Sequence, residues 1–353
     1  MNFKKMLSLV LVVVLCLSVF SACGENKQNT TTTTTEITGQ STGKTIALVG
    51  ENEDSGFYKN LKKGAEEAAK KYGFTLEYMG TEENTENIVT AHISSLEKVI
   101  SNDASGVVII PRGEGYSEIF GKLYDEKIPV VQIDALTEDD FEKIEGNKKN
   151  PVVSMVSTSY KEAGAFCAEK LFEEVKEDIK KSEGTFVIGV IERDDSASDE
   201  EKATGFVEKF SELADADSEI KDKYKIETES ESAVENSLSE LEEIEVKAVF
   251  ITHPSIADKV SDMVSAEAEK YKNIVFCGFD SGAKQLNWLE NENTAKFIGG
   301  VAQDAYNLGY NAVEQCVFSI QGKEVKSEIT IEAKWYDETN LDKMKEDNLI
   351  FEK

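Results

Sequence analysis

From Lys44 onward, short apolar runs alternate with amphipathic stretches, and this alternation restricts the fold more than any other feature of the chain. The runs are continuous, rich in β-branched residues and bounded by turn residues, which is typical of buried parallel strands. Such alternation predicts α/β architecture, with helices covering both faces of each sheet. The predicted strands are residues 46–49, 75–79, 107–110, 130–133, 152–156, 186–191, 224–228, 248–251 and 274–279.

An irregular stretch from Thr137 to Asn150 interrupts the pattern near its middle, which indicates two doubly wound domains rather than one. After the second series, residues 297–302 and 329–336 read as further strands around a helix at 305–320. These elements must join one sheet or the other, so the chain is expected to cross between the domains several times and form a hinge. The other predicted helices of the second half are residues 159–181, 199–213, 233–243, 255–272 and 281–290.

The N-terminal residues predict secretion and a lipid anchor. Lys4 and Lys5 precede an uncharged apolar run, residues 6–20, that is too short to span a bilayer comfortably. The following residues 20–24 resemble a bacterial lipobox, which implies that residues 1–22 are removed as a signal peptide and that Cys23 is acylated. A plain secreted protein cut nearby is the alternative. Residues 23–43 then form the anchor and a Thr-rich linker that lacks the apolar periodicity of a core.

Charge and cysteine content exclude several classes of function. The formal net charge of −29 disfavours nucleic acid and anionic lipid as partners. Cys167, Cys277 and Cys316 lie far apart among apolar neighbours, so buried free thiols are expected. Neither His92 nor His253 shows metal-ligand spacing with them, and we expect no metal and no cofactor.

Several ordered motifs resemble the type I periplasmic binding proteins of the ribose-binding kind. They are residues 46–49 followed by 56–58 and Gly64, then 128–134, 278–280, and 302–303 followed by Gly309. The resemblance implies two doubly wound parallel-sheet lobes joined by a three-crossing hinge, with crossings near Ser157, Gln303 and Ala333. The N-terminal lobe is then 44–156 plus 304–332, and the C-terminal lobe is 157–303 plus 333–353. It also implies a monomer that closes on a small polar ligand, a monosaccharide, outside the cell membrane.

Two aspartates are the first candidates for the ligand site. Asp134 and Asp280 each follow a predicted strand, where ligands bind in parallel α/β sheets. A carboxylate accepts hydrogen bonds from adjacent hydroxyls, and such charge-assisted bonds are stronger than neutral ones. The alternative for each is that it only caps the next helix.

The resemblance places further residues in the pocket. Phe57 and Tyr58 would stack on a sugar, although we expect one of the two to be core, and Gln303 would bond the ligand while marking the hinge. Ala135, Lys202 and His253 depart from the family's sugar pattern, and a solvated lysine and a turn histidine are open alternatives. Ser55 is a further candidate, and Arg112 and Arg193, which also follow strands, are hypothetical sources of a guanidinium.

Two non-enzymatic functions are consistent with these sequence features. The protein is either the ligand-capturing subunit of an ABC permease or a sensing subunit that presents its closed form to a membrane receptor kinase. The same lobe closure serves both functions, so the sequence does not separate them. The sequence lacks a Gly-rich phosphate loop, a nucleophile elbow and a Cys–His pairing, so we expect no enzymatic activity.

Overall fold

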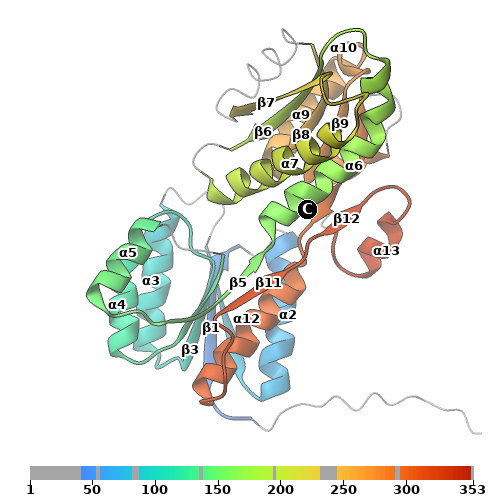
Figure 1. The fold of residues 1–353 in the computed structure, drawn as a ribbon. Coiled ribbons are helices and arrows are strands. Elements are labelled where there is room, and N and C mark those ends of the chain that lie inside the picture. Colours follow the sequence, from blue (N-terminus) through green and yellow to red (C-terminus); the bar gives the residue numbers. More distant parts are fainter. Residues whose placement is uncertain are drawn as a thin grey trace, which may run out of the picture. The chain divides into compact units, whose positions relative to one another are not determined.

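The computed structural model describes residues 41–52, 56–81, 87–134, 138–193, 196–230, 245–290 and 295–350. It contains two six-stranded sheets, ordered β11-β5-β4-β3-β1-β2 and β12-β10-β9-β8-β6-β7. Figure 1 shows the helices packed around each sheet. Cys23, Ser55 and the predicted helix at 233–243 lie outside the described residues. Within them, no helix is both long enough and apolar enough to cross a membrane.

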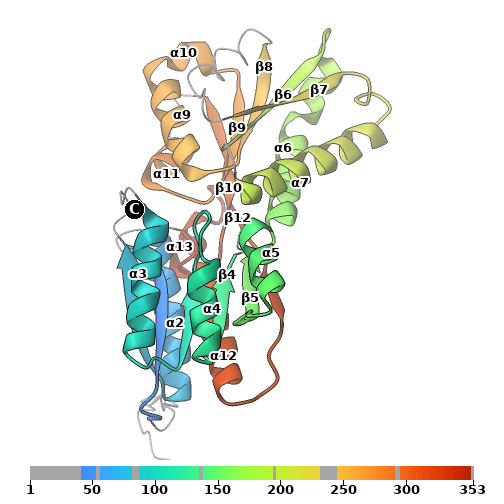
Figure 2. The same cartoon turned by 90° about the vertical axis from the view of Figure 1, so that its left-hand side faces the viewer.

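All strand pairs of the first sheet are parallel. One face packs on α2 and α12, and the other packs on α3, α4 and α5, with an apolar cluster on each side; Figure 2 shows the second group. The elements of this lobe are β1 (Thr45–Glu51), α2 (Gly56–Tyr72), β2 (Thr75–Thr81), α3 (Ile88–Ser101), β3 (Gly106–Ile109), α4 (Ser117–Asp125), β4 (Val130–Ile133), α5 (Glu138–Asn147), β5 (Val152–Thr158), α12 (Ala305–Ile320) and β11 (Glu328–Ile331).

The second sheet is likewise covered on both faces, by α6 and α7 on one and by α9, α11 and α13 on the other. Cys167 and Cys277 lie in its core and Cys316 lies in the core of the first lobe, and all three are buried free thiols, as predicted. The elements are α6 (Tyr160–Lys181), β6 (Phe186–Glu192), α7 (Ala197–Ala216), β7 (Tyr224–Ser230), β8 (Val246–Ile251), α9 (Pro254–Ala266), α10 (Ala268–Tyr271), β9 (Val275–Phe279), α11 (Ala283–Leu289), β10 (Lys296–Ala302), β12 (Lys334–Tyr336) and α13 (Leu341–Glu346).

The chain passes between the two sheets three times. β5 of the first sheet leads into α6, β10 of the second leads into α12, and β11 of the first leads into β12 of the second. The connections are residue 159, residues 303–304 and residues 332–333. The sequence predicts them near Ser157, Gln303 and Ala333.

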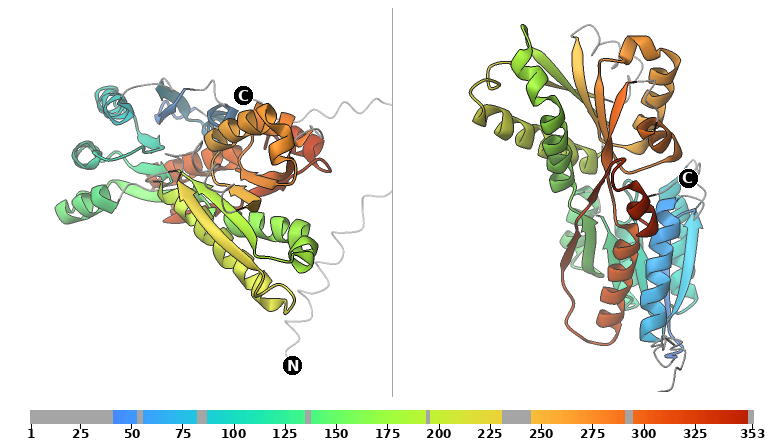
Figure 3. Two further views of the ribbon diagram at one scale, coloured as in Figure 1. Left: turned by 90° about the horizontal axis from the view of Figure 1, so that it is seen from above. Right: turned by 90° about the vertical axis from the view of Figure 1, so that its right-hand side faces the viewer.

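A pair of closely crossing helices lies on each lobe. In the right-hand panel of Figure 3, α2 and α12 run side by side. The α6–α7 pair of the second lobe meets at Gly164 and Gly205, where an added Cβ would lie 1.9 Å from the carbonyl oxygens of Lys202 and Lys161, respectively. Only glycine permits this approach, and the close contact of the two helices fixes the backbone of Lys202 against Gly164.

Two sequence predictions about the elements were wrong. The stretch from Thr137 to Asn150 is not irregular, because it contains α5. Among residues 139–147 of that helix, whose burial is described, only Ile144 and Asp140 are buried and half of Phe141 is exposed, so this part lacks an apolar stripe. Residues 329–336 are not one strand but two, β11 and β12, which belong to different sheets. The predicted class of two doubly wound α/β lobes with parallel sheets is confirmed, and the second sheet adds one antiparallel edge strand, β12, which pairs with β10.

Candidate functional site

Asp134 and Asp280 occupy equivalent places, directly after β4 and β9, the third strands of their sheets. Both have left-handed backbones, with φ of 64° and 57°. Each donates its N–H to a carbonyl of the neighbouring strand, Asp134 to Val156 at 3.0 Å and Asp280 to Val301 at 2.7 Å. Seven non-glycine residues in the described part of the chain have positive φ, and only these two directly follow a strand. The matched geometry therefore marks one aspartate in each lobe as a functional candidate.

The carboxylate of Asp280 is held by Gln303, at the second crossing. Oδ1 accepts from the backbone N–H of Gln303 at 3.2 Å, and Oδ2 accepts from its Nε2 at 2.8 Å. The capping alternative is wrong for Asp280, because the N-cap of α11 is Gly282 and has no side-chain bond. Burial raises the pKa of Asp280 to about 6, although Lys202 and the bonds from Gln303 act to lower it. Above pH 6 the Asp280 carboxylate is thus an ionised hydrogen-bond acceptor, although desolvation disfavours its charged form.

Asp134 has one engaged oxygen and one without a partner. Its Oδ2 accepts from the hydroxyl of Tyr160 at 2.9 Å. Its Oδ1 is buried and has no hydrogen-bond partner among the described residues. Burial raises the pKa of Asp134, and the Tyr160 hydroxyl and the charges of Arg112 and Lys202 act against that shift. An unpaired carboxylate oxygen at a strand end requires a donor, which a bound hydroxyl would supply.

Lys202 is not a solvated lysine, because it is only 2% exposed. Its Nζ donates to Asp199 Oδ1 at 2.6 Å and to the carbonyl of Thr252 at 3.1 Å, and lies 4.0 Å from the Phe279 ring centroid. Desolvation lowers the pKa of Lys202, with Asp199 opposing the shift. Two donors of Lys202 are therefore used inside the lobe and its charge lies against an aromatic face.

Arg193 shares Asp199 with Lys202. Its Nε donates to Asp199 Oδ2 at 2.6 Å and its Nη2 donates to Ser196 Oγ at 3.1 Å. Burial opposes ionisation of Asp199, but Lys202 and Arg193 hold its pKa below the usual range. The guanidinium has further N–H donors besides these two, and the side chain is 26% exposed. The guanidinium hypothesis for Arg193 thus has a structural basis.

His253 is the N-cap of α9, and its Nδ1 accepts from the backbone N–H of Ser255 at 3.1 Å. Desolvation and the charge of Arg193 lower the pKa of His253 to about 3. The ring is therefore neutral at physiological pH. With Nδ1 accepting, Nε2 carries the proton, so His253 is a neutral donor beside the cations.

The two aromatic candidates differ in burial. Tyr58 is 5% exposed and packs in the first-lobe core, whereas Phe57 is half-buried at its edge and meets Tyr58 edge-on at 5.3 Å. The Tyr58 hydroxyl donates to Glu51 at 2.9 Å and accepts from Arg112 Nη2 at 3.2 Å. Arg112 pairs with Glu51 at 2.7 Å. Tyr58 is the core member of the pair, and Arg112 is already engaged by a carboxylate.

Sequence reasoning missed Tyr160, Asp199 and Thr158. Thr158 donates to Gln303 Oε1 at 2.8 Å. For Asp199, the spacing of three residues to Lys202 on a helix with an apolar face was a usable signal. For Tyr160 the signal was weaker, an aromatic residue at a predicted crossing.

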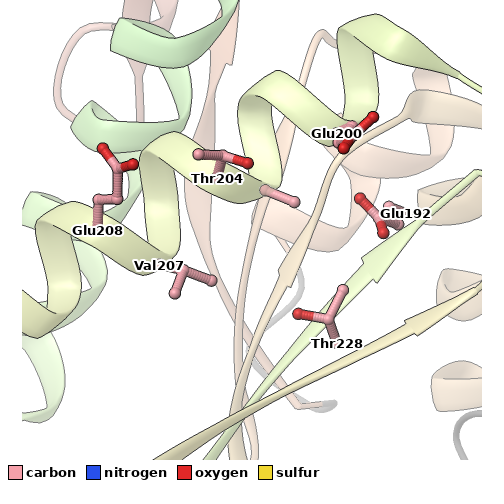
Figure 4. A pocket seen from close by; sticks show the side chains of 7 residues that line it. Glu192, Glu200, Thr204, Val207, Glu208 and Thr228 are labelled. Atoms are coloured by element: carbon pink, nitrogen blue, oxygen red, sulfur yellow. The ribbon is translucent and has the colours of Figure 1, made fainter.

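A separate hollow of about 260 Å³ lies between α7 and the β6–β7 edge. Figure 4 shows the carboxylates of Glu192, Glu200 and Glu208 around it. Glu208 pairs with Lys161 at 2.7 Å. No group of three or more His, Cys, Asp or Glu side chains suited to a metal occurs in the described part of the chain. The hollow is an acidic surface feature that contains none of the candidate residues.

Two α/β lobes joined by three crossings are the arrangement of the periplasmic binding proteins. A family model described as periplasmic binding protein domain matches residues 46–324, and the chain belongs to this family. The comparison with curated proteins returned no match.

Solved structures share the fold. An ABC transporter protein of the LacI family of transcriptional regulators from Brachyspira murdochii is similar at 26% identity and a TM-score of 0.75, covering 88% of this chain and 99% of its own. A glucose-galactose binding protein from Geobacillus stearothermophilus follows at 23% identity and 0.66, with 84% and 98% covered. A carbohydrate transporter solute-binding protein from Agrobacterium radiobacter, solved with D-arabinose, has 20% identity and 0.66, with 88% and 100% covered.

Proposed function

We propose that this protein is a lipid-anchored extracellular binding protein that captures a monosaccharide and delivers it to an ABC permease. One observation carries the proposal: each lobe contributes a desolvated strand-end aspartate, and Oδ1 of Asp134 is buried without a donor among the described residues. Ligand hydroxyls are the donors that match both carboxylates.

The surrounding groups support a neutral, hydroxyl-rich ligand. Arg193 and the neutral His253 supply donors, while Phe57 offers a half-buried ring for the C–H face of a sugar. The cations Arg193 and Lys202 are balanced by Asp199 and Asp280, so they leave no excess of positive charge to attract an anion.

The names of similar structures agree with this ligand class. One was solved with D-fucose, another with α-D-tagatopyranose and a third with D-allose. For anchoring and delivery, the support is the lipobox-like segment around Cys23 and the Thr-rich linker.

A thermal-shift screen tests the proposal. The panel is glucose, galactose, arabinose, fucose, tagatose and allose, with gluconate and glucose 6-phosphate as anionic controls and with amino acids and nucleosides as competing ligand classes. A sugar at a hundred times its Kd stabilises the folded state by about 2.7 kcal/mol, which raises Tm by roughly 4 °C for a protein of this size. No shift with any of the six sugars, alongside a shift with amino acids or nucleosides, would refute the ligand class.

A further inference from the structure

The hydroxyl of Tyr160 contacts one candidate carboxylate, that of Asp134, and also Gln303, the residue that holds the other. Tyr160 begins α6, directly after the first crossing, and its hydroxyl is 2.9 Å from Asp134 Oδ2 and 3.3 Å from Gln303 Oε1. Gln303, at the second crossing, holds Asp280 through its Nε2 at 2.8 Å. Asp134, Tyr160, Gln303 and Asp280 therefore form one connected chain across two of the three lobe crossings.

The Tyr160 hydroxyl donates its single proton to Asp134 in a hydrogen bond. Both neighbours of the hydroxyl are acceptors, but the contact with Asp134 is shorter and its acceptor is a carboxylate, which makes the stronger bond. Gln303 Oε1 already receives a bond from Thr158 Oγ1 at 2.8 Å. Burial and the charge of Asp134 raise the pKa of Tyr160 well above its usual value, so the hydroxyl remains a donor.

Packing fixes the position of the ring. Tyr160 is 9% exposed, and its ring centroid lies 6.0 Å from that of Phe279 and 5.0 Å from Lys202 Nζ. A buried ring in these contacts holds its hydroxyl at one place, so the direction of the Asp134 carboxylate is set from α6 of the other lobe.

We propose that Tyr160 is a positioning residue that determines which ligands Asp134 accepts. By donating to Oδ2 it favours the ionised form of the carboxylate and presents Oδ1, which is buried without a partner in the described residues, as the acceptor for the ligand. The part of the ligand that meets Asp134 must then carry a donor hydroxyl and cannot be a carboxylate or a phosphate. This inference rests on the proposed function, because it assumes that Asp134 faces the ligand.

The variant Y160F removes the hydroxyl and keeps the ring. The Asp134 carboxylate loses a donor to its ionised form, so its pKa rises further; the other charges acting on it, from Arg112, Lys202 and Glu201, are unchanged. Affinity for the best sugar of the six-member panel falls about 10-fold or more, the effect of losing one bond to a charged group.

The experiment is a ¹³C NMR titration of the aspartate carboxyl groups in the ligand-free full chain. Y224F is the matched control, because Tyr224 also donates to an aspartate, Asp215, at 3.0 Å, away from the candidate site. We expect the Asp134 pKa to rise in Y160F and to stay constant in Y224F. An Asp134 pKa that is the same in wild type and Y160F overturns the inference.

Two further measurements keep the test decisive. If Y160F does not fold, difluorotyrosine at position 160 donates more strongly and must lower the Asp134 pKa; no change with it also overturns the inference. Sugar binding is measured separately. A shifted Asp134 pKa with no sugar bound by the wild type supports the role of Tyr160 and refutes the proposed ligand class, whereas full affinity in Y160F refutes the role in ligand selection.

Discussion

Asp280→Asn is expected to change ligand affinity and stability in opposite directions. The wild-type carboxylate is proposed to accept hydrogen bonds from the ligand, and it is also a charge that folding removes from water. In the folded protein both oxygens of Asp280 accept from Gln303, at 3.2 and 2.8 Å. Asparagine retains one acceptor and brings an NH₂ group against the donors of Gln303. The Gln303 amide can turn over to meet it, since the hydroxyl oxygens of Thr158 and Tyr160 beside its other end can accept from its NH₂ group.

The change in stability follows from the pKa of Asp280, which rises from 3.8 to about 6 on folding. The folded state binds the proton more tightly, so this group stabilises folding below pH 3.8 and that contribution is lost as pH rises through 6. The difference amounts to about 3 kcal/mol above pH 6, as an order of magnitude. We therefore expect the difference in unfolding free energy between D280N and wild type, measured without ligand, to shift in favour of D280N as the pH rises from 4 to 7.

Binding is expected to change in the opposite direction. Losing the charge and one acceptor costs about 1.5–3 kcal/mol, or roughly a 10- to 150-fold loss of affinity for the best sugar of the panel. Calorimetry gives the affinity, and denaturant unfolding at several pH values gives the stability. Unchanged affinity would remove Asp280 from the ligand site, and a D280N protein that loses stability relative to wild type as pH rises would contradict the assignment of its pKa.

The other predictions concern anchoring, the buried cation and lobe closure. Cys23→Ala should abolish labelling by fatty acid and release the protein from membranes; continued labelling would disprove the anchor. Lys202→Met removes the hydrogen bonds that Lys202 donates to Asp199 and to the Thr252 carbonyl, and it leaves Asp199 paired with Arg193. The free energy of unfolding, measured in denaturant, should fall by about 3 kcal/mol. A variant as stable as wild type would contradict the buried pair. Small-angle scattering should give a smaller radius of gyration with saturating sugar than without, and an unchanged profile would count against closure.

Much of the fold could be predicted from sequence because the strands are buried on both faces. Continuous runs such as residues 107–110 and 130–133 cannot be exposed, and each became a strand of the first sheet. α5 was missed because its principal buried polar residue, Asp140, acts through its side chain. That carboxylate accepts from the backbone N–H groups of residues 115–117, a long-range contact that has no periodic signal in the sequence.

The site could be predicted only in part, for a related reason. Asp134 and Asp280 follow recognisable strands, so their place at strand ends was accessible from the sequence. The partners that orient them come from the crossings, and their contacts join residues far apart in the chain: Tyr160 to Asp134, and Gln303 to Asp280. Hydropathy reports which residues are buried, but it does not report which buried polar groups face each other.

The two aspartates are unfavourable features of the ligand-free fold, and this is itself evidence for function. Each combines a left-handed backbone with a carboxylate whose pKa burial has raised, and Asp134 also has an oxygen without a described partner. Ligand hydroxyls that donate to both carboxylates would lower both pKa values and satisfy Oδ1, so binding should relieve what folding leaves unfavourable. Because the pKa of Asp280 is about 6, binding should release a proton from this group near that pH, and affinity should fall as the pH decreases through it.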